Sequence, residues 1–502
     1  MNATLSLALS LPLAGFAAAA ATTEWIHSGD GSWDVPAHWS AGVPNLAADA
    51  VTLASVVPVT VTVDVAASDS ALAIGRLNLG GAGAVNRWRL DHLGARPFRL
   101  TDSINVHPGG EVDIVESQLV LDGTLSGGGF HLNSGGLTLR GGAWRVMGGT
   151  TRIGRIGTAA ATVESGEFVT DRDVTIGEQS GSQGTLVLKS GTATVGGTVF
   201  IADDAGSTGR LSVEGGTFTV TGPRLRIGDD GEGRMDLTAG LAVVDDVSVG
   251  RGAGSVGTFR MTGGLMRSGD VSIGRFAGAR GLVEVQGGTL ELLADSLFVG
   301  REGEGELQVA GGNVSAAEVV VASVPGAAGR LVVAGGRLTA GLWVAERPGA
   351  VVRVTGGVVE VTASRFSTGA PLVIGDGVRP ATLRLGAGTH VFAEGLVIEA
   401  GARLEGEGVV QGPLTVRGTD ARGGTPPVPT APEIRWAFDQ GGWAIVVNSV
   451  VGWSYRVETM DDGVWGNWRA LDTGVAGNGG PLRIPVVRGP GARVVRVRLD
   501  PQ

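Results

Sequence analysis

Short runs in which apolar and polar residues alternate fill most of the chain, as in Leu211-Ser212-Val213-Glu214. A period of two places apolar side chains on one face of a β-strand and polar side chains on the other. Between residues 150 and 375 no stretch keeps the 3.6-residue spacing of an amphipathic helix free of glycine. The pattern therefore predicts a succession of short strands, each with one buried face, and excludes helices from this part of the chain.

The strands recur within a longer repeat that reads V-x-I-G, a glycine-rich loop, L-x-V-x-G-G and T-L-x-V, for example over residues 271–292. The last glycine of the L-x-V-x-G-G motif recurs at intervals of 25, 25, 24, 24, 24, 24, 24 and 21 residues, at Gly166, Gly191, Gly216, Gly240, Gly264, Gly288, Gly312, Gly336 and Gly357. The V-x-I-G motif recurs in phase, and its last apolar residue is Ile153, Ile176, Ile201, Ile227, Val249, Ile273, Val299, Val321, Val344 and Ile374. About 24 residues therefore make one turn of a parallel β-helix, a β-solenoid, and parallel crossovers favour the right-handed sense.

Changes in composition divide the chain into five segments. Residues 1–21 combine an apolar run with a string of alanines, which is typical of a secretory signal peptide. Residues 22–70 contain three of the eleven tryptophans and are interpreted as an N-terminal cap segment, and residues 71–417 form the β-helix. Residues 418–433 have the Gly, Thr and Pro content of a linker. Residues 434–502 carry alternating runs that predict a small antiparallel β-sandwich.

Composition and charge narrow the classes of function. The chain has no cysteine, which excludes disulfides, thiolate catalysis and Cys-ligated zinc. It has 39 basic and 49 acidic residues, a net charge of −10, and a field of that sign repels phosphate backbones, so we expect no nucleic-acid partner. No later stretch approaches 18 uninterrupted apolar residues, so no transmembrane segment is predicted. We expect a secreted or cell-surface location and no cofactor.

The residue that follows each V-x-I-G motif predicts a row of charges on the loops. Three acids in successive repeats are followed by three arginines, and the whole row is Arg155, Glu178, Asp203, Asp229, Arg251, Arg275, Arg301, Ser323, Glu346 and Asp376. Carboxylates one turn apart raise each other's pKa or hold a cation. One interpretation is calcium or uronate-rich glycan binding at Glu178, Asp203 and Asp229, with the arginines as carboxylate partners. The other is a solvated turn whose charges keep the solenoid soluble.

The glycine spacings, the single lysine and the histidines of the chain do not predict a functional site, because the surrounding sequence does not fit one. Gly252, Gly254 and Gly257 have the spacing of a dinucleotide-binding loop, but they open a strand and not a helix. The single lysine, Lys189, lacks the glycine spacing of a phosphate-binding loop. No histidine falls within the regular turns, which excludes a histidine-dependent triad or zinc site there. The sequence therefore predicts no catalytic residues.

Two tryptophans near the C-terminus are candidates for glycan binding. Trp465 and Trp468 flank a turn-like Gly-Asn pair, and aromatic rings on β-sandwiches stack on sugar rings. The alternative is that the five tryptophans of this segment fill the core of a domain too small to bury enough surface with smaller side chains.

The unit from Ile201 to Gly216 resembles the repeat shared by bacterial autotransporter passengers and PEP-CTERM-sorted exoproteins. The resemblance covers about three-fifths of the chain and implies a secreted or surface β-solenoid, with no catalytic residues to carry over. Neither a membrane β-barrel nor a Pro-Glu-Pro motif with a hydrophobic tail is present, so neither self-translocation nor that anchor is expected.

The expected fold is all-β, a right-handed parallel β-helix followed by a small antiparallel β-sandwich. The expected function is that of an exported, non-enzymatic structural or adhesive element whose partners are polysaccharides or cell-surface components. Two alternatives stay open: a glycan-binding protein that acts through the C-terminal sandwich, and a polysaccharide lyase or hydrolase on the β-helix. A groove with a convergent acid–base pair would favour the enzyme, and a flat wall would favour the scaffold.

Overall fold

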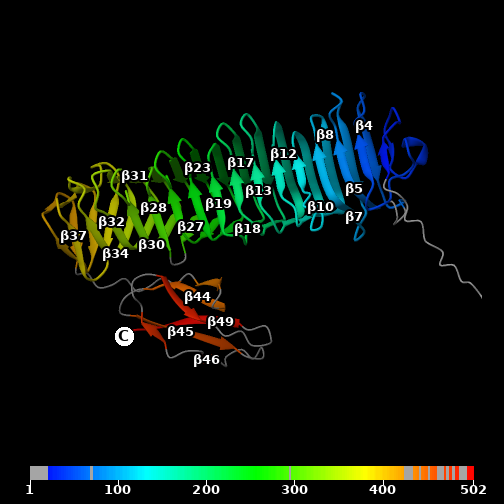
Figure 1. Cartoon of the computed structure of the whole chain (residues 1–502). Coiled ribbons are helices and arrows are strands. Elements are labelled where there is room, and N and C mark those ends of the chain that lie inside the picture. Colours follow the sequence, from blue (N-terminus) through cyan, green and yellow to red (C-terminus); the bar gives the residue numbers. More distant parts are fainter. Residues whose placement is uncertain are drawn as a thin grey trace, which may run out of the picture.

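The computed structural model describes residues 21–67, 72–292 and 295–422, and in the C-terminal part the segments 434–439, 442–449, 453–460, 468–470, 474–476, 481–485 and 494–501. All but the last residue of the predicted signal peptide, and most of the predicted linker, lie outside the described residues. Apart from one 3-10 turn, η1 (Pro36–His38), the described elements are strands. Figure 1 shows a long rod wound from parallel strands, with a smaller group of strands beside it.

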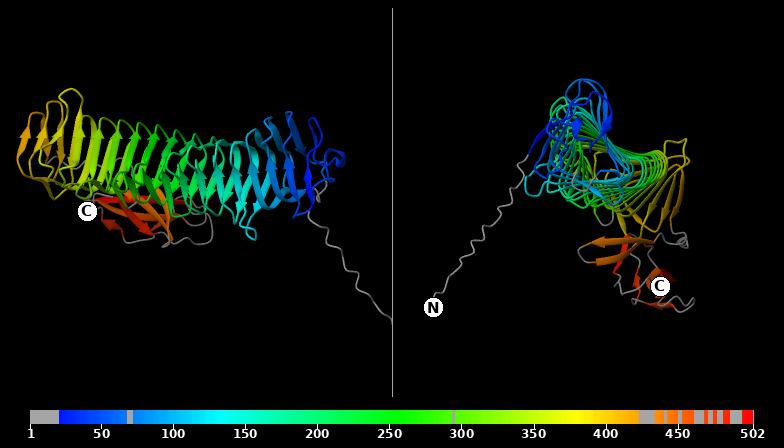
Figure 2. Two further views of the ribbon diagram at one scale, coloured as in Figure 1. Left: turned by 45° about the horizontal axis from the view of Figure 1, so that its top comes forward. Right: turned by 90° about the vertical axis from the view of Figure 1, so that its right-hand side faces the viewer.

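The rod is a β-solenoid of about 16 turns. At about 4.8 Å per turn it is roughly 75 Å long. Its 42 strands form one continuous parallel sheet, and the winding is right-handed, as predicted. Figure 2 shows the closed, stacked outline of the turns when the rod is seen towards its end.

Three ladders of strands make three walls of the rod, which we call faces 1, 2 and 3. Face 1 carries the V-x-I motif, face 2 the L-x-V motif and face 3 the T-L-x-V motif. Each strand pairs in parallel with the corresponding strand one turn earlier and one turn later. Eight longer strands bend at a corner and contribute to two faces.

The strands fall into four groups, according to the face or faces to which they belong. Strands of face 1 alone are β1 (Thr22–Glu24), β3 (Ala50–Leu53), β9 (Phe130–Leu132), β11 (Thr151–Ile153), β13 (Val174–Ile176), β16 (Val199–Ile201), β19 (Arg224–Ile227), β22 (Asp246–Val249), β25 (Val271–Ile273), β28 (Ser296–Val299), β37 (Thr389–Phe392) and β40 (Val409–Gln411). Strands of face 2 alone are β2 (Gly31–Ser32), β4 (Val59–Val63), β6 (Asn86–Asp91), β14 (Gln183–Leu188), β17 (Thr208–Val213), β20 (Glu232–Leu237), β23 (Val256–Met261), β26 (Arg280–Val285), β29 (Glu304–Val309), β31 (Ala328–Val333), β33 (Ala350–Val354), β35 (Leu372–Ile374), β38 (Leu396–Ile398) and β41 (Leu414–Val416). Strands of face 3 alone are β15 (Thr192–Val195), β18 (Thr217–Val220), β21 (Leu241–Val244), β24 (Leu265–Ser268), β27 (Thr289–Leu292), β36 (Ala381–Leu385), β39 (Arg403–Gly406) and β42 (Thr419–Arg422). The strands that turn a corner are β5 (Ala73–Leu79), β7 (Pro97–Val106), β8 (Gly110–Asp122), β10 (Gly135–Met147), β12 (Thr158–Thr170), β30 (Asn313–Val321), β32 (Arg337–Ala345) and β34 (Gly357–Phe366).

The alternation in the sequence becomes the division between core and surface. In the turn over residues 271–292 every second strand residue points inward and is at most 1% exposed, namely Val271, Ile273, Val283, Val285, Leu290 and Leu292. These side chains belong to one hydrophobic core that runs from Trp25 to Leu404. Each turn therefore closes the core of its neighbours, which is why the turns are stable only as a stack.

The repeated glycines line up in a column, as the periodicity predicts. The backbone amides of Leu265 and Thr289 donate to the carbonyl oxygens of Gly240 and Gly264 one turn earlier, at 2.9 and 3.0 Å. Gly264 has φ +74, and a Cβ there would lie 2.8 Å from the Gly240 oxygen. Both the backbone conformation and the space along the column therefore require glycine.

The predicted phase of the V-x-I motif is wrong at its last two members. Val344 pairs with Val320 and not with Val321, so the register has slipped by one residue. Ile374 pairs with Val354 on face 2, so it does not belong to face 1. Glu346 and Asp376 accordingly do not continue the predicted row of loop charges. The turns near these residues have different lengths, which also shortens the glycine interval to 21.

The two ends of the solenoid are closed in different ways. At the N-terminal end β1 to β4 already pair with the sheet, and Trp33 is fully buried against Phe98 with ring centroids 5.3 Å apart. Trp39 Nε1 donates to the Trp33 carbonyl oxygen at 2.7 Å, which fixes this aromatic plug. At the C-terminal end Asp420 lies in register with the buried Leu404 and pairs with Arg422.

The remaining strands form a C-terminal module of two small antiparallel sheets. One sheet contains β43 (Ile434–Asp439), β44 (Gly442–Asn448) and β48 (Pro481–Pro485), and the other contains β45 (Trp453–Met460), β46 (Trp468–Ala470), β47 (Val475–Ala476) and β49 (Val494–Pro501). A common core joins the two sheets as a sandwich, with Ile445, Val447, Tyr455, Val457, Leu482 and Ile484. Arg435 of the module forms an ion pair with Glu291 on face 3.

Candidate functional site

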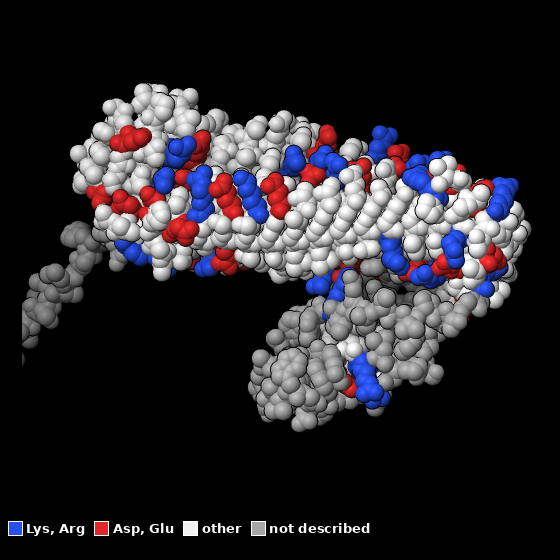
Figure 3. All heavy atoms as spheres, turned by 180° about the vertical axis from the view of Figure 1, so that it is seen from behind, with Lys and Arg blue, Asp and Glu red and all other residues white. Residues whose placement is uncertain are grey.

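Charged side chains pair with one another along the walls of the rod. Arg210 of β17 bonds Asp236 of β20 one turn away at 2.9 Å, and Arg330 of β31 bonds Glu306 of β29 at 2.8 Å. Figure 3 shows charged residues gathered towards the two ends of one wall, with an uncharged band between them. The densest polar row lies elsewhere, on face 1 and the loops that follow it.

The predicted row of loop charges exists over six successive turns. The backbone amides of Asp203 and Asp229 donate to carbonyl oxygens one turn earlier at 2.9 and 3.0 Å. Those of Arg251, Arg275 and Arg301 do the same at 2.9, 2.8 and 3.1 Å. Because these bonds link the same position of each loop, the side chains stand one above another. The order of acids followed by arginines is therefore an order in space.

A second row of polar side chains lies on face 1 and ends beside Glu178, the first acid of the loop row. The sequence did not predict it. Asn105 Nδ2 donates to Asn78 Oδ1 at 3.2 Å, His131 Nδ1 lies 3.2 Å from Asn105 Oδ1, and Arg152 Nη1 lies 3.3 Å from His131 Nε2. Arginine can only donate, so Nε2 of His131 accepts and Nδ1 carries the hydrogen. Burial, followed by the charges of Arg152 and Arg155, lowers the pKa of His131 to about 4, which keeps the ring neutral.

Two carboxylates of the row, Glu178 and Asp203, have raised pKa values. Burial is the largest cause in both, but the neighbouring charges differ. Glu178 lies 3.2 Å from Arg152 Nε and 3.6 Å from Arg155 Nε, yet burial still raises its pKa because it outweighs these charges. Asp203 makes no ion pair within the part of the chain that the structure describes. Burial, followed by Asp229 and the other carboxylates around it, raises the pKa of Asp203 to about 6.

Asp229 differs from its neighbour because arginines hold both of its oxygens. Arg226 Nη1 donates to Oδ2 and Arg251 Nη1 donates to Oδ1, each at 3.0 Å. The carboxylate is only 4% exposed, so these two bonds satisfy it where water does not reach. Arg226 also lies over the ring of Phe200, 4.8 Å from its centroid. The third acid of the row is thus neutralised within the protein.

The arginines that follow lie flat across the face. Arg275 Nη1 donates to Ser248 Oγ and Arg301 Nη1 donates to Ser272 Oγ, both at 2.9 Å. Arg301 also stacks over Phe298 at 4.5 Å from the ring centroid. The middle residue of the V-x-I motif points outward, and in both of these turns it is a serine. Because serine is small, the guanidinium group of the next turn can lie over the strand. Sequence reasoning found the loop arginines but missed these strand residues, although the same register contains them.

The geometry gives the calcium interpretation no support. Among the described residues no group of three or more His, Asp or Glu side chains is arranged to hold a metal ion. Glu178 and Asp229 face arginines, which compete with a cation for their oxygens. What the row can do chemically is bind or release a proton at Asp203 and present guanidinium groups. Calcium binding at Glu178, Asp203 and Asp229 stays a prediction.

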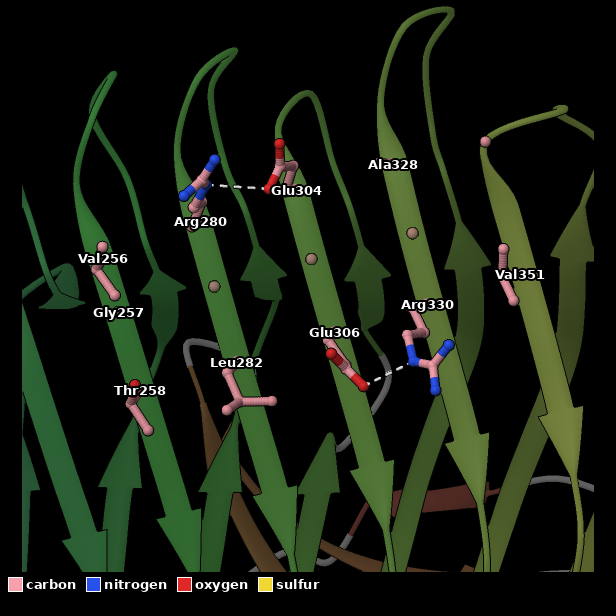
Figure 4. Close-up of a pocket in the computed structure, with 14 residues that line it drawn as sticks. Val256, Gly257, Thr258, Arg280, Leu282, Glu304, Glu306, Ala328, Arg330 and Val351 are labelled. Carbon is pink, nitrogen blue, oxygen red and sulfur yellow. Dashed lines mark hydrogen bonds and ion pairs between the residues drawn. The ribbon is translucent and has the colours of Figure 1, made fainter.

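Two depressions lie on other parts of the surface. One, of about 410 Å³, crosses five strands of face 2, where Arg280 bonds Glu304 at 3.1 Å and Arg330 bonds Glu306. Figure 4 shows these pairs bridging adjacent strands; the near strands run down and the far strands up as the chain advances, which is the right-handed winding. The other depression, of about 560 Å³, lies near the N-terminal end beside Asp30 and Arg89. Neither depression contains the raised-pKa carboxylates.

The predicted glycan-binding tryptophans fall at the margin of what the structure describes. Trp465 lies outside the described residues. Trp468 begins β46, where its backbone pairs with Met460 of β45, but its side chain is not described. Glycan binding by these two residues stays a prediction.

The fold and the surface define a class, the right-handed parallel β-solenoids, here with a C-terminal β-sandwich and ladders of ion pairs between turns. No helix in the described ranges is both long enough and apolar enough to span a bilayer. Comparison of the chain with protein-family models, with curated proteins and with solved structures finds no match.

Proposed function

We propose that the protein is exported and serves as a non-enzymatic structural or adhesive element at the cell surface or outside the cell. The observation that carries the proposal is the surface of the rod: its walls are ladders of strands whose charged side chains pair across neighbouring turns, as Arg330 and Glu306 do. Such a wall offers a long, rigid surface for contact. The apolar run and alanines of residues 1–21 support export.

The distribution of raised pKa values argues against catalysis on the solenoid. A general acid and base must converge on one point in a site that excludes water. Asp203 and Glu178 stand side by side on an outer row of loops, and the two depressions described above lie elsewhere. In the depression of about 410 Å³ the carboxylates Glu304 and Glu306 are engaged by arginines.

Two measurements test the proposal. Expression of the full chain in a bacterial host, followed by fractionation and N-terminal sequencing, should find the protein outside the cytoplasm and shortened near residue 21. The purified chain should bind intact cells or insoluble polysaccharide, and should release no reducing ends or unsaturated uronates from a panel of neutral and acidic polysaccharides.

The enzymatic alternative makes the opposite prediction. Product release that is abolished in Asp203→Asn or Glu178→Gln, while a charge-matched variant such as Glu302→Gln on an exposed loop keeps it, would replace the scaffold by an enzyme. A chain that stays in the cytoplasm and binds no surface would also reject the proposal.

A further inference from the structure

The middle of face 3 presents an uncharged strip of outward-facing side chains. We call it the face 3 strip, and its members are Val169, Thr192, Thr194, Thr217, Thr219, Leu241, Val243 and Leu265. Ion pairs mark its two borders, Arg145–Glu167 on the N-terminal side and Arg267–Glu291 on the C-terminal side. Figure 3 shows an uncharged band of this kind between charged ends of the wall.

The backbone fixes the spacing of the strip. Thr192, Thr217, Leu241 and Leu265 follow one another in register on successive turns, so their side chains repeat at about 4.8 Å along the rod. The second column, which includes Thr219, lies two residues along each strand, at about 6.6 Å. β-Branched side chains have few rotamers, so the strip is rigid as well as flat.

The size of the strip excludes most kinds of partner. Along the rod it covers four intervals of about 4.8 Å between turns, and across the rod it is two side chains wide. With the outer halves of the side chains at its edges included, its area is about 300 Å². A stable protein interface needs about 800 Å² on each side. The strip has no cation, so it offers nothing to phosphate or to acidic glycans. It also lacks the aromatic and basic residues with which proteins bind membrane surfaces.

The chemistry of the strip matches one class of ligand. Threonine presents a hydroxyl group and a methyl group side by side, and the valines and leucines add aliphatic surface. A neutral sugar ring likewise presents hydroxyl groups at its edge and C–H groups on its faces. Hydroxyl groups that remain hydrogen-bonded to a ligand lose little on desolvation, and the aliphatic surface gains from burial.

We infer that the face 3 strip binds a neutral polysaccharide, with one extended chain lying along the rod. This inference rests on the proposed adhesive function and names the class of ligand. The C-terminal module lies against the end of the strip, because Arg435 pairs with Glu291, which is only 6% exposed. A chain that leaves the strip at this end would next meet the module.

The test is retention of the full chain on insoluble neutral polysaccharides, with cellulose and chitin as probes, compared with soluble alginate as an acidic probe. The double variant Thr219→Glu and Val243→Glu introduces charge into the strip without changing the core, and should weaken retention by about tenfold or more. Thr258→Glu, at a comparable half-buried outward position on face 2, is the matched control and should change it less than about twofold. Circular dichroism and melting temperature establish that all variants fold.

Several outcomes would overturn the inference. If the double variant and Thr258→Glu lose retention equally, the strip is not the binding site. If the chain binds alginate alone, the ligand is not a neutral polysaccharide. Either result overturns the inference but not the proposed adhesive function. Concentration-dependent self-association that the double variant abolishes would also overturn the inference, because the strip would then receive a second copy. Binding to no surface at all would reject the adhesive function itself.

Discussion

Replacing Asp203 by asparagine is expected to stabilise the protein at neutral pH and not at pH 4. Burial, followed by the neighbouring carboxylates, raises the pKa of Asp203 from 3.8 to about 6. Between these pH values the folded chain holds a proton that the unfolded chain releases. The stability contributed by this group is therefore fully present below about pH 4 and is lost as the pH rises to about 6. Asparagine keeps the shape and removes the charge.

The magnitude follows from the size of the shift. About two pKa units correspond to about 3 kcal/mol as an upper limit. Asp203 is half-buried, and its loop can relax or admit water, so the expected gain is about 1–2 kcal/mol. A cooperative unit of about 400 residues has an unfolding entropy of about 0.8 kcal/mol/K, so the melting temperature should rise by about 1–2 °C.

Differential scanning calorimetry of the wild-type protein and the variant at pH 4 and pH 7.5 measures the effect. At each pH the melting temperature of the variant is compared with that of the wild type. This comparison is needed because His131 makes the stability of both proteins depend on pH in the opposite direction. Its pKa is lowered to about 4, so its contribution is present above about pH 6.5 and is lost as the pH falls. Glu302→Gln, on an exposed loop, controls for the change in net charge. Equal differences at both pH values, or a variant less stable at pH 7.5, would refute the reasoning.

Three further predictions concern the backbone column, the module and metal. Gly264→Ala should cost about 2–4 kcal/mol in unfolding experiments, because φ is positive and the column is tight, whereas Gly254→Ala, also at positive φ but with open space around it, should cost about 1 kcal/mol. Glu291→Arg should release the C-terminal module and increase the radius of gyration in X-ray scattering, and adding Arg435→Glu should restore the wild-type value. Millimolar calcium should leave the melting temperature unchanged, since arginines pair with two of the three acids, Glu178 and Asp229; a rise of several degrees would establish a calcium site.

The sequence predicted the solenoid well because inward and outward positions alternate so regularly. In the turn over residues 271–292 every second strand residue is buried, as the alternation predicts, and the column of glycines exists. The phase failed at Val344 and Ile374 because all three faces use the same apolar alternation. A V-x-I run on face 2 is indistinguishable from one on face 1 unless the residues between them are counted correctly, and the turn lengths change there.

The row of charges was only half predictable for a related reason. Loop residues such as Asp229 and Arg251 follow a recognisable motif, so their stacking could be derived from the repeat. Their partners lie on strands, and whether Arg226 reaches forward to Asp229 or outward into solvent depends on side-chain conformations that the pattern does not contain. Asp203 shows the consequence: three similar acids were predicted, but among the described residues Asp203 forms no ion pair with an arginine.

The ends of the rod explain why a parallel ladder of this kind stops. An open parallel edge is a template for further strands, whether from the same chain or from another copy. At the N-terminal end Trp39 packs on the buried Trp33, with ring centroids 4.8 Å apart, and so covers the core. At the C-terminal end Asp420 follows Leu404 on the inward side and pairs with Arg422 at 2.7 Å. Covering that pair with another apolar turn would remove both charges from water at a cost of several kcal/mol, so this end discourages the addition of a further turn.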